Sequence, residues 1–227
     1  MPNWKPDNLR RCSLQLLMAI SLAASLPMQA YAGAYDDYFQ AVKADDVVAV
    51  TSLLQRGFDP NTVEPERGDS GLVLAVREKA MKVFAVLLQA RGTDVDLKIN
   101  NGDTALMIAA YTANKQAVAA LLAKDAAVNR SGWTPLHYAA AGGDDDIVKM
   151  LLDKAAIPDA PSPNKTTPMM MAARGGHIYV VKTLLDAGAD ATLKNDAGMT
   201  AIDFARQSGN QDIVEGLTYR LKKAGKL

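Results

Sequence analysis

The segment Thr134-Pro135-Leu136-His137 decides the fold of this chain, together with Ala139-Ala140 directly behind it and Leu151-Leu152 further on. Related segments begin at three other threonines, Thr104, Thr167 and Thr200. In the first three of these four copies a Leu-Leu pair follows the threonine at one constant distance. Successive copies recur with a period of about 33, which indicates a solenoid of stacked units, each of which shields the apolar side of its neighbours.

The same register extends toward the N-terminus. Ser70 precedes Leu87-Leu88 by the distance that separates Thr134 from Leu151-Leu152, and Asp36 precedes Leu53-Leu54 by the same distance. Spacing therefore predicts six units, centred near residues 34–62, 63–97, 98–129, 130–160, 161–194 and 195–227.

The Thr-Pro-Leu-His phrase at this period resembles the ankyrin-repeat family, and the resemblance covers nearly everything after residue 33. It implies an all-α solenoid of about six helix-turn-helix units with short β-turn fingers, forming one domain over residues 33–227. It also implies a protein-binding role without catalytic activity.

The residues of one unit give this resemblance a physical basis. Thr134 can cap a first helix with its hydroxyl, and Pro135 then occupies the first helical position, where its missing N–H costs nothing. Gly142-Gly143 can end that helix because glycine tolerates a positive φ. Apolar residues from Ile147 onward recur at helical spacing and predict a second helix. The connection before Thr134 is three residues short, which predicts a clipped finger there.

Residues 1–32 do not fit the repeat. Basic residues at Lys5, Arg10 and Arg11 precede an uncharged apolar run over 13–26, and Ala30-Tyr31-Ala32 ends it with small residues at alternate positions. This order is typical of a secretory signal peptide, and we expect cleavage after Ala32. The apolar run is short for a membrane-spanning helix, so we expect no stable membrane insertion after cleavage. An uncleaved leader acting as an envelope anchor is the alternative.

Cleavage would also remove Cys12, the single cysteine of the chain, and with it disulfides and thiolate chemistry. The 25 basic and 25 acidic residues of the whole chain would lose three and one respectively, which leaves a net charge of −2. A nearly neutral charge disfavours nucleic acid as a partner. The export signal and the cysteine-free remainder together predict a periplasmic location, and we expect a monomer.

Three groups of residues could carry chemistry, and each has a structural interpretation. His137 and His177 occupy turn positions of the repeat, where the family's imidazoles hydrogen-bond to nearby backbone. Asp144-Asp145-Asp146 could bind a cation, but acidic residues at this point also cap the second helix. Met169, Met170 and Met171 could bind Cu(I); we predict Met169 and Met171 as core residues and Met170 and Met199 as the free thioethers. We expect no catalytic residue, metal or cofactor.

The resemblance also places the partner-binding residues. In the family these are the residue before each threonine position and the residues seven and eight beyond it, on the concave side of the stack. The predicted finger residues are Asp69, Asp103, Trp133, Thr166 and Met199. The predicted helix residues are Arg77, Glu78, Tyr111, Thr112, Arg174 and Gln207, and Asn100, Asn101 and Arg130 complete the rim.

Two classes of function follow. The first is an exported protein-binding module with a protective or inhibitory role, such as neutralising a toxin or shielding a stress-response enzyme. The second is an accessory factor or enzyme in peroxide detoxification. A haem-bearing version of the second class would need an axial ligand, and the turn positions of both histidines argue against one.

Overall fold

The computed structural model describes residues 28–227, with side chains from Gly33 onward. The predicted signal peptide lies outside the described residues up to residue 27. The first described helix, α2 (Met28–Lys43), begins ahead of the predicted cleavage point.

Residues 28–227 form twelve helices that alternate between two positions in the stack. The first helices of the six pairs are α2 (Met28–Lys43), α4 (Gly71–Arg77), α6 (Ala105–Tyr111), α8 (Pro135–Gly142), α10 (Pro168–Gly175) and α12 (Ala201–Gln207). The second helices are α3 (Val47–Gln55), α5 (Met81–Gln89), α7 (Lys115–Leu122), α9 (Asp145–Asp153), α11 (Ile178–Asp186) and α13 (Gln211–Lys223). The all-α solenoid predicted from the repeat is confirmed.

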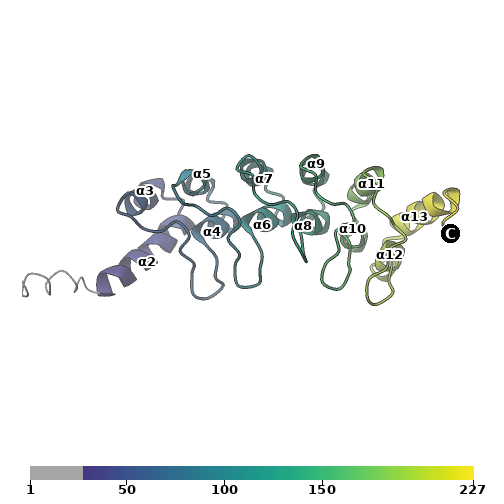
Figure 1. Cartoon of the computed structure of the whole chain (residues 1–227), viewed down its shortest axis with the longest axis horizontal. Helices are drawn as coiled ribbons and strands as arrows, with labels where there is room; N and C mark the ends of the chain where they lie inside the picture. Colours follow the sequence, from purple (N-terminus) through teal and green to yellow (C-terminus); the bar gives the residue numbers. More distant parts are fainter. Residues whose placement is uncertain (1–27) are drawn as a thin grey trace, which may run out of the picture.

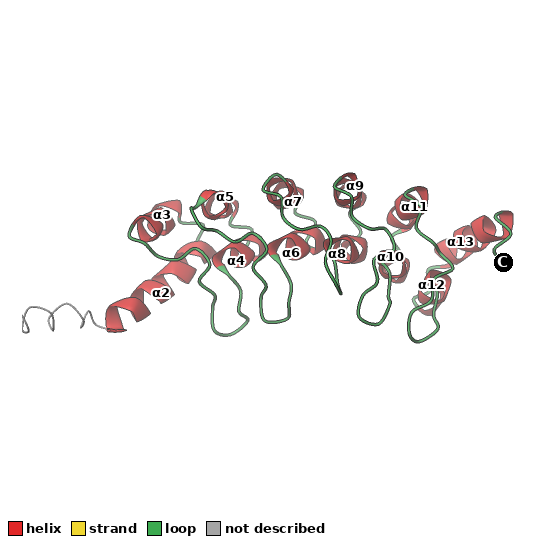
Figure 2. Ribbon diagram, in the orientation of Figure 1, coloured by secondary structure: helices red, strands yellow, loops and turns green. Residues whose placement is uncertain are grey.

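The six pairs stand side by side along one axis (Figure 1). The second helices form the upper row of the view and the first helices the lower row, from which the connecting loops project downward (Figure 2). Each helix packs on its partner in the pair and on the neighbouring helix of its own row. We call the surface made by the loops and the exposed side chains of α4, α6, α8, α10 and α12 the finger face.

The loops of the finger face are β-turns rather than strands. Within residues 28–227 no segment forms a β-strand, and the bridge between Val63 and Ser70 stands alone. In the loop before α12, Asn195 N donates to Met199 O at 3.0 Å, and the loop before α10 closes in the same way from Ser162 to Thr166. The loop before α8 spans only residues 123–134, against 154–167 before α10, so the expected clipped finger is present.

Small side chains allow the first helices to approach one another closely. Ala109 and Ala110 of α6 are fully buried, as are Ala139 and Ala140 of α8. The second helices contribute larger residues, including Leu121 and Leu151, which are also fully buried. Burying a leucine side chain stabilises a fold by about 2 kcal/mol, so each leucine of this layer stabilises the stack by that order.

The ends of the helices follow local chemistry. Thr167 Oγ1 accepts a hydrogen bond from Met170 N at the start of α10, and Thr200 Oγ1 accepts from Asp203 N at the start of α12. Gly143 ends α8 in the left-handed region at φ 82°. The corresponding residue of the third pair is Ala113, which adopts φ 55° without the freedom of a glycine.

The prediction for two methionines was wrong. Met170 is 1% exposed, because its position, like that of His137 in α8, faces the neighbouring pair. Met171 was predicted as a core residue and is instead half-buried on the finger face. Met169 is fully buried, as expected.

Candidate partner-binding site

A pocket of about 320 Å³ opens on the finger face at the middle of the stack. Its lining consists of Tyr111, Trp133, His137, Tyr138, Ala141, Met171 and Arg174. Three of the predicted partner-binding residues, Tyr111, Trp133 and Arg174, thus come together in one place. They belong to three successive units, so the pocket exists only in the assembled stack.

The pocket exists because one position of the repeat carries a small residue. The position seven residues beyond each threonine or serine is Arg77, Tyr111, Ala141, Arg174 and Gln207 in successive units. Ala141 therefore leaves a gap in a row of long side chains. The gap has Tyr111 on one side and Arg174 on the other, and both residues line the pocket.

The aromatic walls are held in place by contacts within the stack. Tyr138 Oη donates to Asp103 Oδ1 at 2.5 Å, and the rings of Tyr111 and Tyr138 meet edge-on with centroids 6.3 Å apart. Burial raises the pKa of Tyr138, and the hydrogen bond to the Asp103 carboxylate raises it further. The phenol therefore remains a neutral donor, which fixes the orientation of the ring.

His137 forms the back of the pocket and joins two units. Its Nδ1 accepts from Thr134 N at 3.1 Å, so the ring proton lies on Nε2, which donates to Thr166 O at 2.9 Å. Burial lowers the pKa of His137, although the hydrogen bonds to backbone carbonyls oppose the shift. The ring of Trp133 meets this imidazole edge-on at 5.2 Å.

The second histidine is structural as well. His177 precedes α11, and its Nε2 lies 3.1 Å from Ala141 O in the previous unit. The structural interpretation of both histidines is confirmed by these contacts. Because both ring nitrogens of His137 are engaged, it has no nitrogen to offer a haem iron.

Three of the predicted partner-binding residues are buried, which corrects the expectation that they face solvent. Asp69 is fully buried, Asp103 is 6% exposed and Thr166 is 3% exposed. In these three units the residue before the capping serine or threonine lies under the loop, whereas Trp133 and Met199 at the same position remain partly exposed. Asp103 accepts from Tyr138 of the next unit, and Thr166 lends its carbonyl to His137. These residues hold the loops in place.

Two predicted arginines brace the loops as well. Arg77 Nε lies 2.9 Å from Asp69 Oδ2. Neither atom has a hydrogen-bond partner of suitable geometry in the described chain, so the opposite charges hold the pair together. Arg130 Nη1 donates to Gly102 O at 2.7 Å. Both side chains are half-buried, which limits what they can offer a partner.

The remaining predicted residues reach the surface outside the pocket. Glu78, Thr112 and Gln207 are exposed, and so is the rim residue Asn101, while Met199 is half-buried. Gln207 Nε2 lies 3.6 Å from Met199 Sδ, so these two predicted residues of the sixth unit contact each other.

Sequence reasoning missed Tyr138, Ala141 and Met171. Tyr138 and Met171 occupy the position four residues beyond the threonine, where every unit from the second onward has an apolar residue. In the second and third units that residue is buried, as Leu74 is at 2% exposure, whereas Tyr138 and Met171 remain half-buried. An apolar row on the finger face was the signal that could have identified them.

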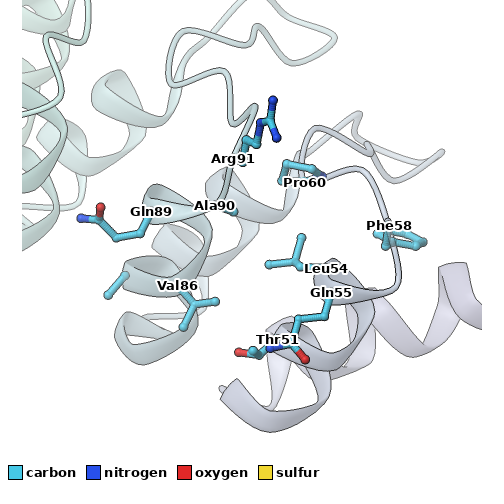
Figure 3. A pocket seen from close by; sticks show the side chains of 10 residues that line it. Thr51, Leu54, Gln55, Phe58, Pro60, Val86, Gln89, Ala90 and Arg91 are labelled. Atoms are coloured by element: carbon cyan, nitrogen blue, oxygen red, sulfur yellow. The ribbon is translucent and has the colours of Figure 1, made fainter.

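A second, larger groove of about 620 Å³ lies away from the finger face, between α3 and α5. Figure 3 shows Leu54 and Thr51 of α3 facing Val86 of α5, with Arg91 and Pro60 at one end. None of the partner-binding residues predicted from the sequence lies in this groove. Its polar lining residues do not form an arrangement suited to catalysis or metal binding.

The acidic and sulfur-containing clusters also have structural roles. Asp144 caps α9 by accepting from Asp146 N and Ile147 N, each at 3.1 Å, so the helix-capping interpretation is confirmed. Met169 and Met170 are buried in the core. Within residues 28–227 no three His, Cys, Asp or Glu side chains come close enough together to hold a metal.

The architecture and the surface define a helical-repeat solenoid that presents a rigid, loop-lined face. The family model for ankyrin repeats in three copies matches residues 72–162 and 156–224, which is more than half of the chain. The chain belongs to the ankyrin-repeat family. Within residues 28–227 no helix combines the length and the apolar character needed to cross a bilayer.

Three curated proteins are similar to part of this chain. Transient receptor potential cation channel subfamily A member 1 of Homo sapiens is 36% identical over 115 residues, which cover 49% of this chain and 10% of the channel. SH3 and multiple ankyrin repeat domains protein 2 of Homo sapiens is 36% identical over 115 residues, covering 48% of this chain and 6% of that protein. Neurogenic locus notch homolog protein 2 of Homo sapiens is 36% identical over 111 residues, which cover 48% of this chain and 4% of that protein. The chain spans a tenth or less of the length of these relatives, so the similarity concerns a small part of each.

Proposed function

We propose that this protein is an exported, non-enzymatic module that binds a protein partner through the finger face. The pocket at the centre of that face supports the proposal most directly. Tyr111 is 56% exposed on a rigid stack, beside the half-buried rings of Trp133 and Tyr138. Large aromatic residues on a preformed surface are common anchors of protein interfaces, because they bury much area at little entropic cost.

The cellular role in this proposal is protective or inhibitory, in the periplasm. The basis for the location is the sequence of residues 1–32, with their basic start, apolar run and small-residue end. The basis for the role is that a repeat array acts by covering a partner's surface. Neutralising a toxin and shielding a stress-response enzyme both work in this way.

Capture of a partner from an envelope extract tests the binding part of the proposal. The immobilised protein should retain a partner that the double variant Tyr111→Ala, Trp133→Ala retains at least ten-fold less. Tyr179→Ala is the matched control, since Tyr179 is 75% exposed but lies on α11, in the row of second helices. Equal capture by all three proteins would exclude the finger-face pocket as the binding surface.

A second experiment tests export. Sequencing of the N-terminus of protein recovered from the envelope fraction should give Gly33 as the first residue. An intact Met1 in the membrane fraction would instead favour the anchored alternative, and recovery only from the cytoplasm would remove export from the proposal.

A further inference from the structure

We infer that the central pocket receives one aromatic side chain of the partner, from a segment in which an acidic residue follows the aromatic one. This inference rests on the proposed function and adds the chemistry of the partner. It follows from the shape of the pocket, the nature of its walls and the charge at its edge.

The size of the pocket suits a single ring. A closed apolar cavity of about 150 Å³ holds a benzene molecule. The open pocket measures about 320 Å³, which leaves room for an aromatic side chain and part of its backbone. Because Ala141 is the small residue that creates the gap, its methyl group forms part of the floor.

The walls favour an aromatic guest over an aliphatic one. Tyr111, Trp133 and Tyr138 offer ring faces and edges, and aromatic pairs at about 4.5–7 Å add about 1 kcal/mol beyond the area that they bury. Met171 adds a thioether, which makes favourable contacts at ring edges. Tyr138 is held by its hydrogen bond to Asp103, and Trp133 contacts the buried ring of His137, so a guest need not order these two side chains.

The edge of the pocket toward the fifth unit carries a cation. Arg174 is exposed, and among residues 28–227 no carboxylate lies within ion-pairing distance of its guanidinium. The arginines at the end of two other first helices are paired within their own units, Arg77 with Asp69 at 2.9 Å and Arg206 with Asp203 at 2.9 Å. Arg174 can therefore offer a planar fork of donors to a carboxylate of the partner.

The backbone beneath Arg174 is fixed. Its carbonyl accepts from Asn210 Nδ2 at 3.1 Å, and the adjacent carbonyl of Ala173 accepts from the same amide at 2.8 Å. The cation thus has a defined origin on one side of the aromatic pocket. This arrangement places the carboxylate of the guest on the Arg174 side of its aromatic ring.

The experiment uses the fluorescence of Trp133. The chain has two tryptophans, so Trp4→Phe in the full-length protein leaves Trp133 as the single reporter at the pocket wall. The probes are blocked hexapeptides of sequence Gly-Ser-Phe-Asp-Ser-Gly, with matched versions in which Ala replaces Phe or Lys replaces Asp. We expect the first peptide to change the emission of Trp133 in a saturable manner and each replacement to weaken binding at least ten-fold.

Two variants separate the parts of the inference. Ala141→Leu fills the gap and should abolish the fluorescence response, while an unchanged melting temperature shows that the stack is intact. Arg174→Gln alters only an exposed side chain and should make the Asp and Lys peptides bind equally. Unchanged binding to either variant, or no preference for Phe-Asp in the parent protein, would overturn the inference.

The extract experiment separates failure of this inference from failure of the proposed function. If Tyr111→Ala, Trp133→Ala loses the partner from the extract while Ala141→Leu and Arg174→Gln retain it, the finger face binds but the aromatic–acidic recognition is wrong. If all of these variants retain the partner, the proposed function itself fails.

Discussion

His137 is predicted to couple the fourth and fifth units, and its replacement should weaken the stack at that point. The imidazole is fully buried and contacts backbone on both sides of the unit boundary, Thr134 N at 3.1 Å and Thr166 O at 2.9 Å. The equivalent residue of the fifth unit is Met170, whose sulfur lies 3.4 Å from Thr167 N. Methionine at residue 137 is therefore a replacement that the repeat already tolerates.

The expected loss of unfolding free energy differs between two variants, His137→Ala and His137→Met. In His137→Ala, the Thr134 N–H loses its acceptor inside the protein, which costs about 1–3 kcal/mol. Thr166 O keeps the hydrogen bond from Ser162 N at 3.0 Å, so losing the imidazole there costs only about 1 kcal/mol. With the cavity left by the ring, we expect a loss of about 4 kcal/mol. For His137→Met we expect about 1–2 kcal/mol, because sulfur is a weak acceptor and the volume is nearly kept.

Urea denaturation of the wild-type protein and both variants measures the loss. Hydrogen exchange then shows which helices lose stability, since the stability of a repeat protein is a sum of contributions from units and from nearest-neighbour interfaces. Protection should decrease mainly in α8 and α10. A loss below about 0.5 kcal/mol for His137→Ala, which is the range of ordinary surface substitutions, would refute the coupling that we assign to this residue. A decrease spread evenly over all helices would refute it as well.

Three further predictions concern acid stability and helix ends. Burial lowers the pKa of His137, so the unfolded chain takes up a proton at a higher pH than the folded protein does. The free energy of unfolding should therefore fall as the pH drops below the ordinary value of 6.5, by at most about 1.4 kcal/mol per pH unit. This slope should be smaller in His137→Met when melting is followed from pH 7.5 to 5. Ala113→Gly should stabilise the protein by about 0.5 kcal/mol, because φ at Ala113 is 55° and Gly143 fills the same position one unit on. The control Ala119→Gly, in the middle of α7, should destabilise the protein by about 1 kcal/mol. A change of the same sign in both variants would contradict the argument. Asp144→Ala should cost about 1 kcal/mol by removing the cap of α9, and an unchanged melting temperature would show that solvent replaces the carboxylate.

The pairs of helices could be predicted from the sequence because each unit repeats the same local instructions. Thr167 and Thr200 cap helices as their positions predict, and Gly143 ends α8 with a positive φ. The methionines were harder. Spacing alone placed Met171 in the core. The same position is buried in the second and third units, but in the fourth, fifth and sixth units it is half-buried at the finger face.

The candidate site could be predicted only in part. Tyr111, Trp133 and Arg174 were predicted on this face because the repeat sets which positions lie there. Asp103 was misjudged because its carboxylate is used by Tyr138 of the next unit, and such a contact depends on a residue far along the chain. The pocket itself exists because the side chain of Ala141 is small and lies between two long ones. A prediction based on prominent residues does not reveal such a gap.

The left-handed residues between paired helices divide the molecule into two halves. Asp45, Lys79 and Ala113 hold this conformation in the first three pairs without glycine, while glycines fill it in the last three. Because a non-glycine residue there costs on the order of 1 kcal/mol, the N-terminal pairs carry more backbone strain at this position. We expect the array to nucleate among its C-terminal pairs when it folds, and to unzip from its N-terminal end when it is pulled apart.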